Sequence, residues 1–213
     1  MDPDFWLTKW RANEIGFHQT EIHPLLADHW AGHWPPLNAL RVLVPLCGKS
    51  RDLVWLRERG HVVIGFELSP IAVEAFFAEQ GLRPLIVNDG PFTRYEAGGI
   101  TIYCGDFFQA STERCGSFTA VYDRAALIAL ASEQRDTYAA TLRRLCLLGA
   151  RGLLITVEYP LDTIAAPPFS IEGPEVMARF TPWSEVSLLE RRAAEVKGRP
   201  ALELAYEFVV GAN

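Results

Sequence analysis

Four polar or turn-forming clusters follow apolar, β-branched runs, and each could do chemistry at the end of a strand. They span residues 45–50, 67–69, 104–108 and 122–124. In an open parallel sheet, ligands bind outside the carboxyl ends of the strands, near the point where the strand order reverses. The four clusters therefore predict one ligand site at the mouth of such a sheet.

The first cluster, Pro45 to Ser50, contains Gly48, which lets the backbone approach a ligand where a Cβ would clash. The cluster lacks the glycine pattern of a dinucleotide-binding turn and the upstream glycine of a P-loop. It is therefore no phosphate cradle. A plain strand-to-helix turn is an equally good interpretation of this segment alone.

Glu67 stands directly after the second apolar run. A carboxylate at this point can accept hydrogen bonds from both ribose hydroxyls of a nucleoside. A nucleoside without a pyrophosphate needs only this carboxylate and a close-packed loop, so S-adenosylmethionine is favoured over NAD as the cofactor. The alternative is that Glu67 caps a helix or lies on the surface before Ser69-Pro70.

The third cluster runs through Cys104, Gly105, Asp106, Phe107 and Phe108. Asp106 can accept a hydrogen bond from an adenine amino group, and Phe107 or Phe108 can pack on the base. The competing interpretations are a turn aspartate and phenylalanines that only fill the core. We predict adenine contacts for Asp106 and Phe107.

Arg124 ends the fifth apolar run. A guanidinium there can bind a carboxylate through two parallel hydrogen bonds, for example that of the methionine part of the cofactor. The alternative is a salt bridge to Asp123 or Glu67. We predict Arg124 as a residue of the active site.

His29 and His33 have the i, i+4 spacing of a metal-binding helix pair. No H-E-x-x-H motif or third ligand accompanies them, so a packed or solvated helix face is the better interpretation and no metal is predicted. The chain also lacks the G-x-S-x-G elbow of an α/β hydrolase.

The elements that must position these clusters alternate between strand and helix. Strands are expected at 40–44, 61–66, 85–87, 100–104, 118–122 and 152–157, and helices at 51–59, 70–80 and 132–148. Ser69 and Pro70 are typical of a helix start, while Gly60, Gly81 and Gly149 are typical stops. Segment 91–99 is expected to be irregular or a hairpin. Two extended stretches, 186–189 and 202–210, close the chain without a long helix between them, so they should pair antiparallel.

This order predicts an α/β fold with a doubly wound, mostly parallel seven-stranded sheet that is Rossmann-like. Residues 1–38 are expected to form an N-terminal helical cap, in which Trp6 and Trp10 lie one turn apart and Pro35-Pro36 ends a second helix. Residues 39–213 form the predicted core. The whole chain, 1–213, is expected to be one domain.

Composition narrows the class of protein further. The chain has 213 residues, enough for one large core, and a formal net charge of −6, which disfavours nucleic acid and anionic membranes as partners. Its four cysteines form no C-x-x-C pair and are expected to be free thiols in a reducing compartment. No secretion signal or membrane span is visible, so we expect a cytoplasmic protein.

Several ordered motifs make the chain resemble the thiopurine S-methyltransferase family, especially its bacterial members. They are Trp10-Arg11 with 15–19, then Val44-Pro45-Leu46-Cys47-Gly48-Lys49, Arg59 to Ser69, Phe76 to Gln80, Ile102 to Phe107, and Tyr122 to Leu127. These matches run from about Trp6 to Pro168, and the blocks at 45–49 and 59–67 are quite specific. The last forty or so residues match less clearly.

The resemblance implies a monomer that uses S-adenosylmethionine, with Trp10, Leu46, Glu67 and Arg124 at the cofactor or active site. By analogy, Trp10 folds over the site, where its aromatic face can approach the sulfonium. The implied acceptors are thiopurines and related aromatic thiols, with selenium or tellurium compounds for bacterial relatives. Asp106 is closer to other methyltransferases than to some relatives, which carry a small residue there.

Methyl transfer to sulfur requires mainly that the acceptor sulfur, the methyl carbon and the leaving sulfur are aligned. Arg124 can bias the acceptor towards its thiolate form. Segment 159–173 is expected to be a lid or an ordinary loop, and Arg191, Arg192 and Arg199 are candidates for acceptor contacts. The competing hypotheses are a methyltransferase with another acceptor atom, an NAD-dependent oxidoreductase, and a catalytically silent nucleoside-binding protein.

Overall fold

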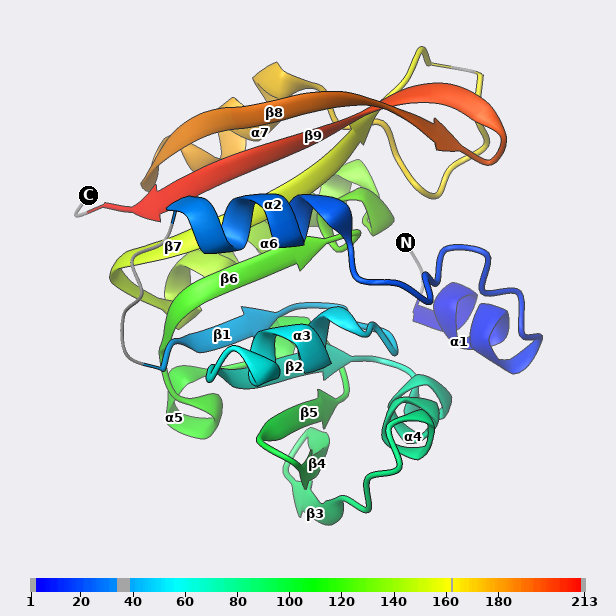
Figure 1. The fold of residues 1–213 in the computed structure, drawn as a ribbon, viewed down its shortest axis with the longest axis vertical. Helices are drawn as coiled ribbons and strands as arrows, with labels where there is room; N and C mark the ends of the chain where they lie inside the picture. The colour runs from blue at the N-terminus through cyan, green and yellow to red at the C-terminus, as the bar shows by residue number, and fades with distance from the viewer. Residues whose placement is uncertain (1–2, 34–38, 162, 212–213) are drawn as a thin grey trace. The chain divides into compact units, whose positions relative to one another are not determined.

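The computed structural model describes residues 3–33, 39–161 and 163–211 (Figure 1). The chain divides after Ala110 into two compact units. The predicted helix stop at Pro35-Pro36 lies outside the described residues.

The first unit contains a five-stranded sheet in the order β3-β4-β5-β2-β1. The strands are β1 (Arg41–Val44), β2 (Val62–Glu67), β3 (Leu85–Asp89), β4 (Phe92–Ala97) and β5 (Ile100–Cys104). β1, β2 and β5 run parallel, and their arrows point the same way in Figure 1. β3 and β4 pair antiparallel with each other, and β4 pairs antiparallel with β5.

Two helices of the first unit match predicted helices, those at 51–59 and 70–80. The helices of this unit are α1 (Pro3–Arg11), α2 (Pro24–His33), α3 (Asp52–Glu58), α4 (Pro70–Glu79) and the short 3-10 helix η1 (Phe107–Gln109). At the start of α4 the Ser69 hydroxyl accepts a hydrogen bond from the Ala72 N–H at 3.4 Å, which confirms the predicted cap. Gly60 and Gly81 follow α3 and α4 with φ of 85° and 65°, the left-handed conformation that ends helices.

The second unit contains four strands in the order β6-β7-β9-β8. They are β6 (Phe118–Arg124), β7 (Cys146–Glu158), β8 (Ser184–Val196) and β9 (Arg199–Val210). β6 and β7 are parallel, whereas β7 with β9 and β8 with β9 are antiparallel, as predicted for the end of the chain. Its helices are α5 (Thr112–Cys115), η2 (Leu127–Ala129), α6 (Ser132–Leu145) and α7 (Gly173–Phe180).

The α/β architecture is confirmed, but the predicted number of seven strands is wrong. The described residues contain nine strands, and the pairing within both units is mixed. Eight of these nine strands lie in segments that were expected to be extended, and the ninth, β4, lies in the segment expected to be irregular or a hairpin. The short turns at Gly90, at Gly98-Gly99 and at Lys197-Gly198 leave no room for a crossover helix, so the strands that they join must be antiparallel.

The boundary between α6 and β7 also differs from the prediction. The helix was expected to reach Leu148 and stop at Gly149, but it ends at Leu145 and the strand begins at Cys146. The β6–β7 register shifts between Phe118 and Ala120, where three extra residues of β7 are accommodated. Gly149, with φ of 76°, lies in this irregularity, so its left-handed backbone marks a bulge rather than a helix end.

Buried strands explain the nearly continuous apolar runs of the sequence. Residues 63–67 of β2 and 152–157 of β7 are buried throughout. Both faces of a parallel strand are usually covered, so both sets of alternate side chains are apolar.

In the described part of the chain, no helix combines the length and apolarity needed to cross a membrane.

Gly152 is the position where the core has no room for a side chain. It faces Phe208 across the β7–β9 pair, and an added Cβ would lie 2.0 Å from Phe208 Cζ. We therefore expect Gly152→Ala to lower the free energy of unfolding by about 3 kcal/mol, because the ring must move within a packed core. Urea denaturation measures this change. Gly16→Ala is the matched control, since no atom lies within 4 Å of an added Cβ there. Equal stability of the two variants would contradict the prediction.

Candidate active site

The predicted site residues of the first unit lie at one edge of its sheet. The loop with Leu46 and Gly48 follows β1, Glu67 ends β2, and Asp106 follows β5. The register pairs Val44 with Gly65 and Glu67 with Cys104, so the three parallel strands end close together. This edge is the carboxyl end of these strands, where the sequence predicts the ligand site.

The Glu67 side chain connects two of these loops. Its Oε2 accepts a hydrogen bond from the Gly48 N–H and its Oε1 accepts one from the Ser69 N–H, both at 2.8 Å. The Glu67 carbonyl also accepts a bond from the Gly105 N–H at 2.9 Å. The carboxylate is therefore held by the backbone beside the ends of β1 and β2. Each carboxylate oxygen can accept more than one hydrogen bond, so capacity remains for two hydroxyl donors of a ligand.

Burial sets the electrostatics of this carboxylate. Glu67 is 7% exposed. Desolvation raises its pKa above the ordinary value, and the backbone hydrogen bonds from Ser69 and Gly48 act in the opposite direction. Hydrogen bonds donated by the hydroxyl groups of a ligand would stabilise the ionised carboxylate further. A ligand with two adjacent hydroxyls is thus the partner that this group suits.

The loop after β1 has an unusual backbone. Leu46 and Gly48 both lie in the left-handed region, with φ of 47° and 54°. A leucine rarely adopts this conformation, and such strain is typical of ligand-binding loops. The Cys47 N–H donates to the Phe66 carbonyl at 2.8 Å, which holds the loop against the end of β2. This bond fixes the loop at the edge of the sheet.

Trp10 packs directly against this loop. A Cβ added to Gly48 would lie 3.4 Å from Trp10 Cζ2, so glycine permits the close approach of the ring. The indole is 6% exposed and meets Phe17 edge-on, with ring centroids 5.6 Å apart. Within the first unit, the N-terminal helix α1 thus delivers an aromatic ring to the loop whose residues were predicted to bind the cofactor.

Sequence reasoning missed the pair formed by Cys47 and Gly65. Cys47 Sγ occupies the space that a side chain at Gly65 would need, 2.7 Å from the position of its Cβ. Burial, and then the charge of Glu67, raises the pKa of the Cys47 thiol well above its usual range. The thiol therefore stays protonated and fills space under the loop. Two small residues that are distant in the sequence produce no repeating pattern of apolar residues, so nothing in the sequence indicates that they are in contact.

Asp106 and Phe107 have the structural roles that the sequence left open. Asp106 caps η1, because its Oδ1 accepts a hydrogen bond from the Phe108 N–H at 3.0 Å. Phe107 is 4% exposed and packs edge-on against Phe66, with centroids 5.3 Å apart. The adenine contacts of both residues stay predictions.

Arg124 lies in the second unit, at the carboxyl end of β6. Its side chain is half-buried, and it has no hydrogen-bond or ion-pair partner among the described residues. The adjacent Asp123 does not pair with it; that carboxylate accepts hydrogen bonds from Tyr138 and from backbone N–H groups instead. The guanidinium is thus available for an anionic ligand.

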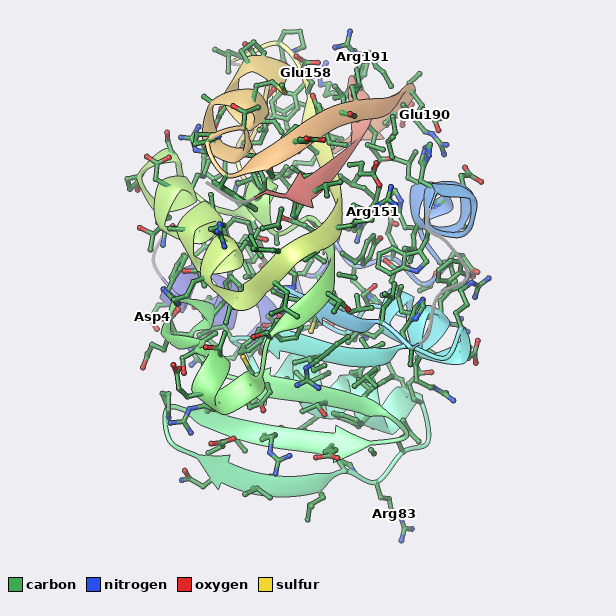
Figure 2. All side chains as sticks on the ribbon, turned by 90° about the vertical axis from the view of Figure 1, so that its left-hand side faces the viewer. Asp4, Arg83, Arg151, Glu158, Glu190 and Arg191 are labelled. Carbon is green, nitrogen blue, oxygen red and sulfur yellow. The ribbon has the colours of Figure 1, made fainter. Side chains whose placement is uncertain are left out.

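The three C-terminal arginines differ in their surroundings. Arg191 Nη2 lies 3.8 Å from Glu158 Oε2, at the carboxyl end of β7 (Figure 2). Arg192 Nε donates to Glu190 Oε1 at 2.8 Å. Arg199 is exposed at the start of β9. Arg191 is therefore the candidate that approaches the carboxyl end of a parallel strand.

The segment after β7 is tied down near both of its ends. Tyr159 donates its hydroxyl to the Pro168 carbonyl, and its backbone exchanges two hydrogen bonds of 2.9 Å with the Ser170 hydroxyl. The Phe169 N–H donates to the Ile128 carbonyl at 2.7 Å, and the guanidinium of Arg135 lies over the Phe169 ring. These contacts anchor residues 168–170 to β7 and η2. Movement of this segment as a lid stays a prediction.

The histidine pair gives no sign of a metal centre. His29 is buried on α2, and the side chain of His33 lies outside the described residues. Within residues 3–33, 39–161 and 163–211, no group of three His, Cys, Asp or Glu side chains could hold a metal ion.

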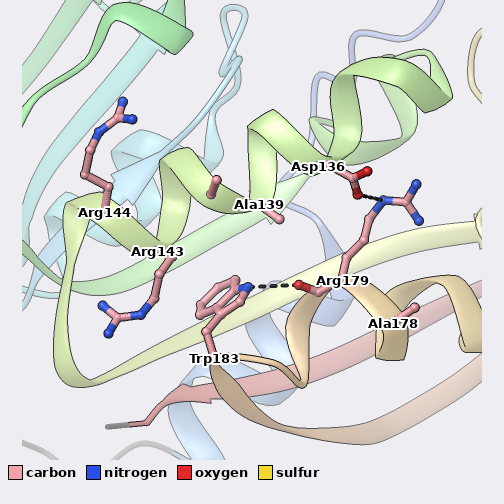
Figure 3. Close-up of a pocket in the computed structure, with 8 residues that line it drawn as sticks. Asp136, Ala139, Arg143, Arg144, Ala178, Arg179 and Trp183 are labelled. Carbon is pink, nitrogen blue, oxygen red and sulfur yellow. Dashed lines mark hydrogen bonds and ion pairs between the residues drawn. The ribbon is translucent and has the colours of Figure 1, made fainter. Parts of the chain in front are cut away.

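A hollow of about 430 Å³ lies elsewhere in the second unit, between α6 and α7 (Figure 3). Arg143, Arg179 and Trp183 line it, together with alanines. Arg179 Nε lies 3.1 Å from Asp136 Oδ1, and the Trp183 indole N–H donates to the Arg179 carbonyl at 2.8 Å. None of the predicted site residues lines this hollow, so we do not assign it to the chemistry.

The fold is that of S-adenosylmethionine-dependent methyltransferases. Magnesium protoporphyrin IX methyltransferase from Synechocystis PCC 6803 with bound SAH superimposes with a TM-score of 0.66 at 14% identity, over 99% of this chain and 100% of that one. A Burkholderia thailandensis 1,6-didemethyltoxoflavin-N1-methyltransferase with bound S-adenosylhomocysteine gives 0.65 at 13% identity, over 99% and 87%. At these identities the likeness concerns the fold alone.

A model of the thiopurine S-methyltransferase family matches residues 1–205. A thiopurine S-methyltransferase of Pseudomonas fluorescens (strain Pf0-1) is 47% identical over 192 residues, which cover 90% of this chain and 88% of the relative. One from Methylococcus capsulatus is 45% identical over 203 residues, 95% of this chain and 90% of the relative. The chain belongs to the thiopurine S-methyltransferase family. It is a methyltransferase, and its cofactor is S-adenosylmethionine.

Proposed function

We propose that this chain transfers a methyl group from S-adenosylmethionine to the sulfur of small aromatic or heterocyclic thiols of the thiopurine type, with selenium or tellurium compounds as further acceptors. The observation that carries the proposal is the buried Glu67 carboxylate, held by the Gly48 and Ser69 N–H groups at the carboxyl end of β2. Membership of the family over residues 1–205 supports the choice of acceptor.

The residues of the first unit fit the donor well. Glu67 binds the ribose hydroxyls, and the strained loop at Leu46 and Gly48 brings backbone close to the nucleoside. Asp106 accepts from the adenine amino group, and Phe107 supports the base from the core side. The Trp10 ring beside Gly48 offers its π-face to the sulfonium. No phosphate cradle is needed, since the donor carries no phosphate.

The chemistry requires little from the protein beyond orientation. When bound, S-adenosylmethionine supplies a methyl carbon attached to a good leaving group. The chain aligns the acceptor sulfur with that carbon and keeps water away from it. Glu67 is not a base in this scheme, because its oxygens are occupied by the Gly48 and Ser69 N–H groups and by the ribose.

Arg124 is the residue of the second unit that we assign to the reaction. Its unpaired guanidinium favours an anion, which is either the carboxylate of the donor or the thiolate of the acceptor. Arg191, beside Glu158 at the end of β7, is the further candidate for contact with an acceptor. Residues 159–173 act as a lid over the acceptor.

The remaining assignments concern the chain as a whole. We propose that residues 1–213 act as one monomeric methyltransferase domain, with α1 and α2 of residues 1–38 as its helical cap. The four cysteines of the described structure are free, which suits the reducing cytoplasm.

The decisive experiment is turnover with a methyl donor that is labelled on its methyl group. We expect labelled product with a heterocyclic thiol, and at least about tenfold less with the matched phenol or amine, because the acidic thiol ionises to a strong nucleophile whereas the phenol and the amine react in their weaker, neutral forms. Activity should survive a chelator. Higher turnover of the phenol or amine would favour a different acceptor atom. Donor binding with no turnover of any acceptor would favour a silent nucleoside-binding protein.

A further inference from the structure

A buried carboxylate lies one residue before the end of β6, and the mechanism above does not use it. Asp123 has no exposed surface. Its Oδ1 accepts hydrogen bonds from the Ala126 N–H at 3.2 Å and the Leu127 N–H at 3.4 Å. Its Oδ2 accepts one from the Tyr138 hydroxyl at 2.6 Å. Both oxygens are therefore committed to specific donors within the second unit.

These bonds enclose a strained turn. Ala125 has φ of 69°, a left-handed conformation that a residue with a Cβ rarely adopts. The strain persists only where the surroundings hold the backbone in place. The bonds from the Ala126 and Leu127 N–H groups to Asp123 span this residue, so they hold the turn closed. Arg124 lies between Asp123 and Ala125, and its backbone is therefore fixed on both sides.

Tyr138 fixes the carboxylate from the opposite side. It is a fully buried residue of α6, and burial together with the charge of Asp123 raises the pKa of its hydroxyl well above the usual range. The hydroxyl is thus a donor at every working pH. In the ionised form both oxygens of Asp123 accept, so all three donors are matched, whereas a proton on Oδ2 would replace the bond that Tyr138 donates to it.

We propose that Asp123 and Tyr138 are positioning residues that hold the turn presenting Arg124, and that efficient methyl transfer requires Asp123 to be ionised. The proposal rests on the proposed function and deepens it, since it assigns the site a pH dependence of its own. Neither residue needs to touch the donor or the acceptor.

The titration of Asp123 supports this dependence. Burial raises the pKa of its carboxyl to about 6, while the bonds from Tyr138, Leu127 and Ala126 act in the opposite direction. The neighbouring titratable or charged groups are Tyr138 on α6, Cys146 beside that hydroxyl at the start of β7, and Arg124 on the same strand. Between pH 8 and 5 the carboxylate thus changes from mainly ionised to mainly protonated.

Protonation of Asp123 affects the stability of the fold in the opposite direction to its effect on activity, so a loss of activity can be distinguished from acid unfolding. The pKa of Asp123 is higher in the folded chain than its ordinary value of 3.8. The folded state therefore binds the proton more tightly, and the contribution of this group to stability increases as the pH falls from about 6 towards 4. Loss of activity through Asp123 is consequently expected without loss of fold.

The test compares the pH profile of kcat/KM for a heterocyclic thiol in three variants. Tyr138→Phe removes one donor to the carboxylate, so the acid limb should move to higher pH by about one unit, with about a threefold loss at pH 6.5 and little loss at pH 8. Asp123→Asn should reduce kcat/KM about tenfold or more at all pH values and remove this limb. Thr141→Val is the control, because that buried hydroxyl of α6 bonds to the Thr137 carbonyl and not to Asp123.

A second measurement does not depend on turnover. Hydrogen exchange of the Ala126 and Leu127 amides should be at least about tenfold faster in Tyr138→Phe and Asp123→Asn than in the wild type and in Thr141→Val. Unchanged exchange together with an unshifted acid limb would overturn the proposal. A wild-type protein without thiol turnover would refute the proposed function by itself, and the exchange rates would still decide whether the turn is held as described.

Discussion

Glu67→Gln is expected to weaken binding of S-adenosylhomocysteine about 100- to 10,000-fold. A hydrogen bond to a charged group contributes roughly 1.5–3 kcal/mol, and the ribose makes two of them, while 1.4 kcal/mol corresponds to about tenfold in affinity. The glutamine also turns an NH₂ group towards either the Gly48 or the Ser69 N–H, both of which now donate to the carboxylate. Isothermal titration calorimetry measures the dissociation constant directly.

The control for this variant follows from the structure. Glu79 is unsuitable, because its Oε1 lies 2.6 Å from the Nζ of Lys49, in the loop after β1. Glu58 is exposed at the end of α3, and Glu58→Ala should bind S-adenosylhomocysteine as the wild type does. If Glu67→Gln and Glu58→Ala bind with equal affinity, Glu67 has no role at the ribose.

Arg124→Ala is expected to lower kcat/KM for a heterocyclic thiol about 100-fold. The guanidinium can form two charge-assisted hydrogen bonds with a carboxylate, or stabilise a thiolate by its charge, and a loss of about 2.7 kcal/mol corresponds to this factor. Steady-state kinetics with both substrates varied measures the change. Arg143→Ala on α6, a half-buried arginine of the same unit, is the control.

The two roles of Arg124 can be separated with matched ligands. Methylthioadenosine retains the ribose and the base of S-adenosylhomocysteine but lacks its carboxylate. If Arg124 binds that carboxylate, Arg124→Ala should weaken only S-adenosylhomocysteine, whereas Glu67→Gln should weaken both ligands. If Arg124 serves the acceptor, both ligands should bind as before while kcat/KM falls. Wild-type kinetics in Arg124→Ala would contradict any role for Arg124 in the site.

Much of the local structure was predictable from residue order alone. Ser69, Pro70 and Gly81 delimit α4 as expected, because capping and left-handed backbone depend on single residue types. Gly149 shows the limit of such signals. The same left-handed glycine suits a helix end and a strand bulge, and only the pairing of β7 with β6 decides between them.

The amino-acid sequence by itself determined the alternation of strands and helices, the family, and the placement of Glu67 and Arg124 after apolar strands. These features depend on the types and order of residues in short segments, which the amino-acid sequence gives without any knowledge of the fold. Only the tertiary structure decided that β3 and β4 pair antiparallel, that Trp10 packs on Gly48, and that Asp123 bonds to Tyr138 rather than to Arg124. Those contacts join residues distant in the chain or select one of several partners, and that selection depends on packing and burial, which arise only when the chain is folded.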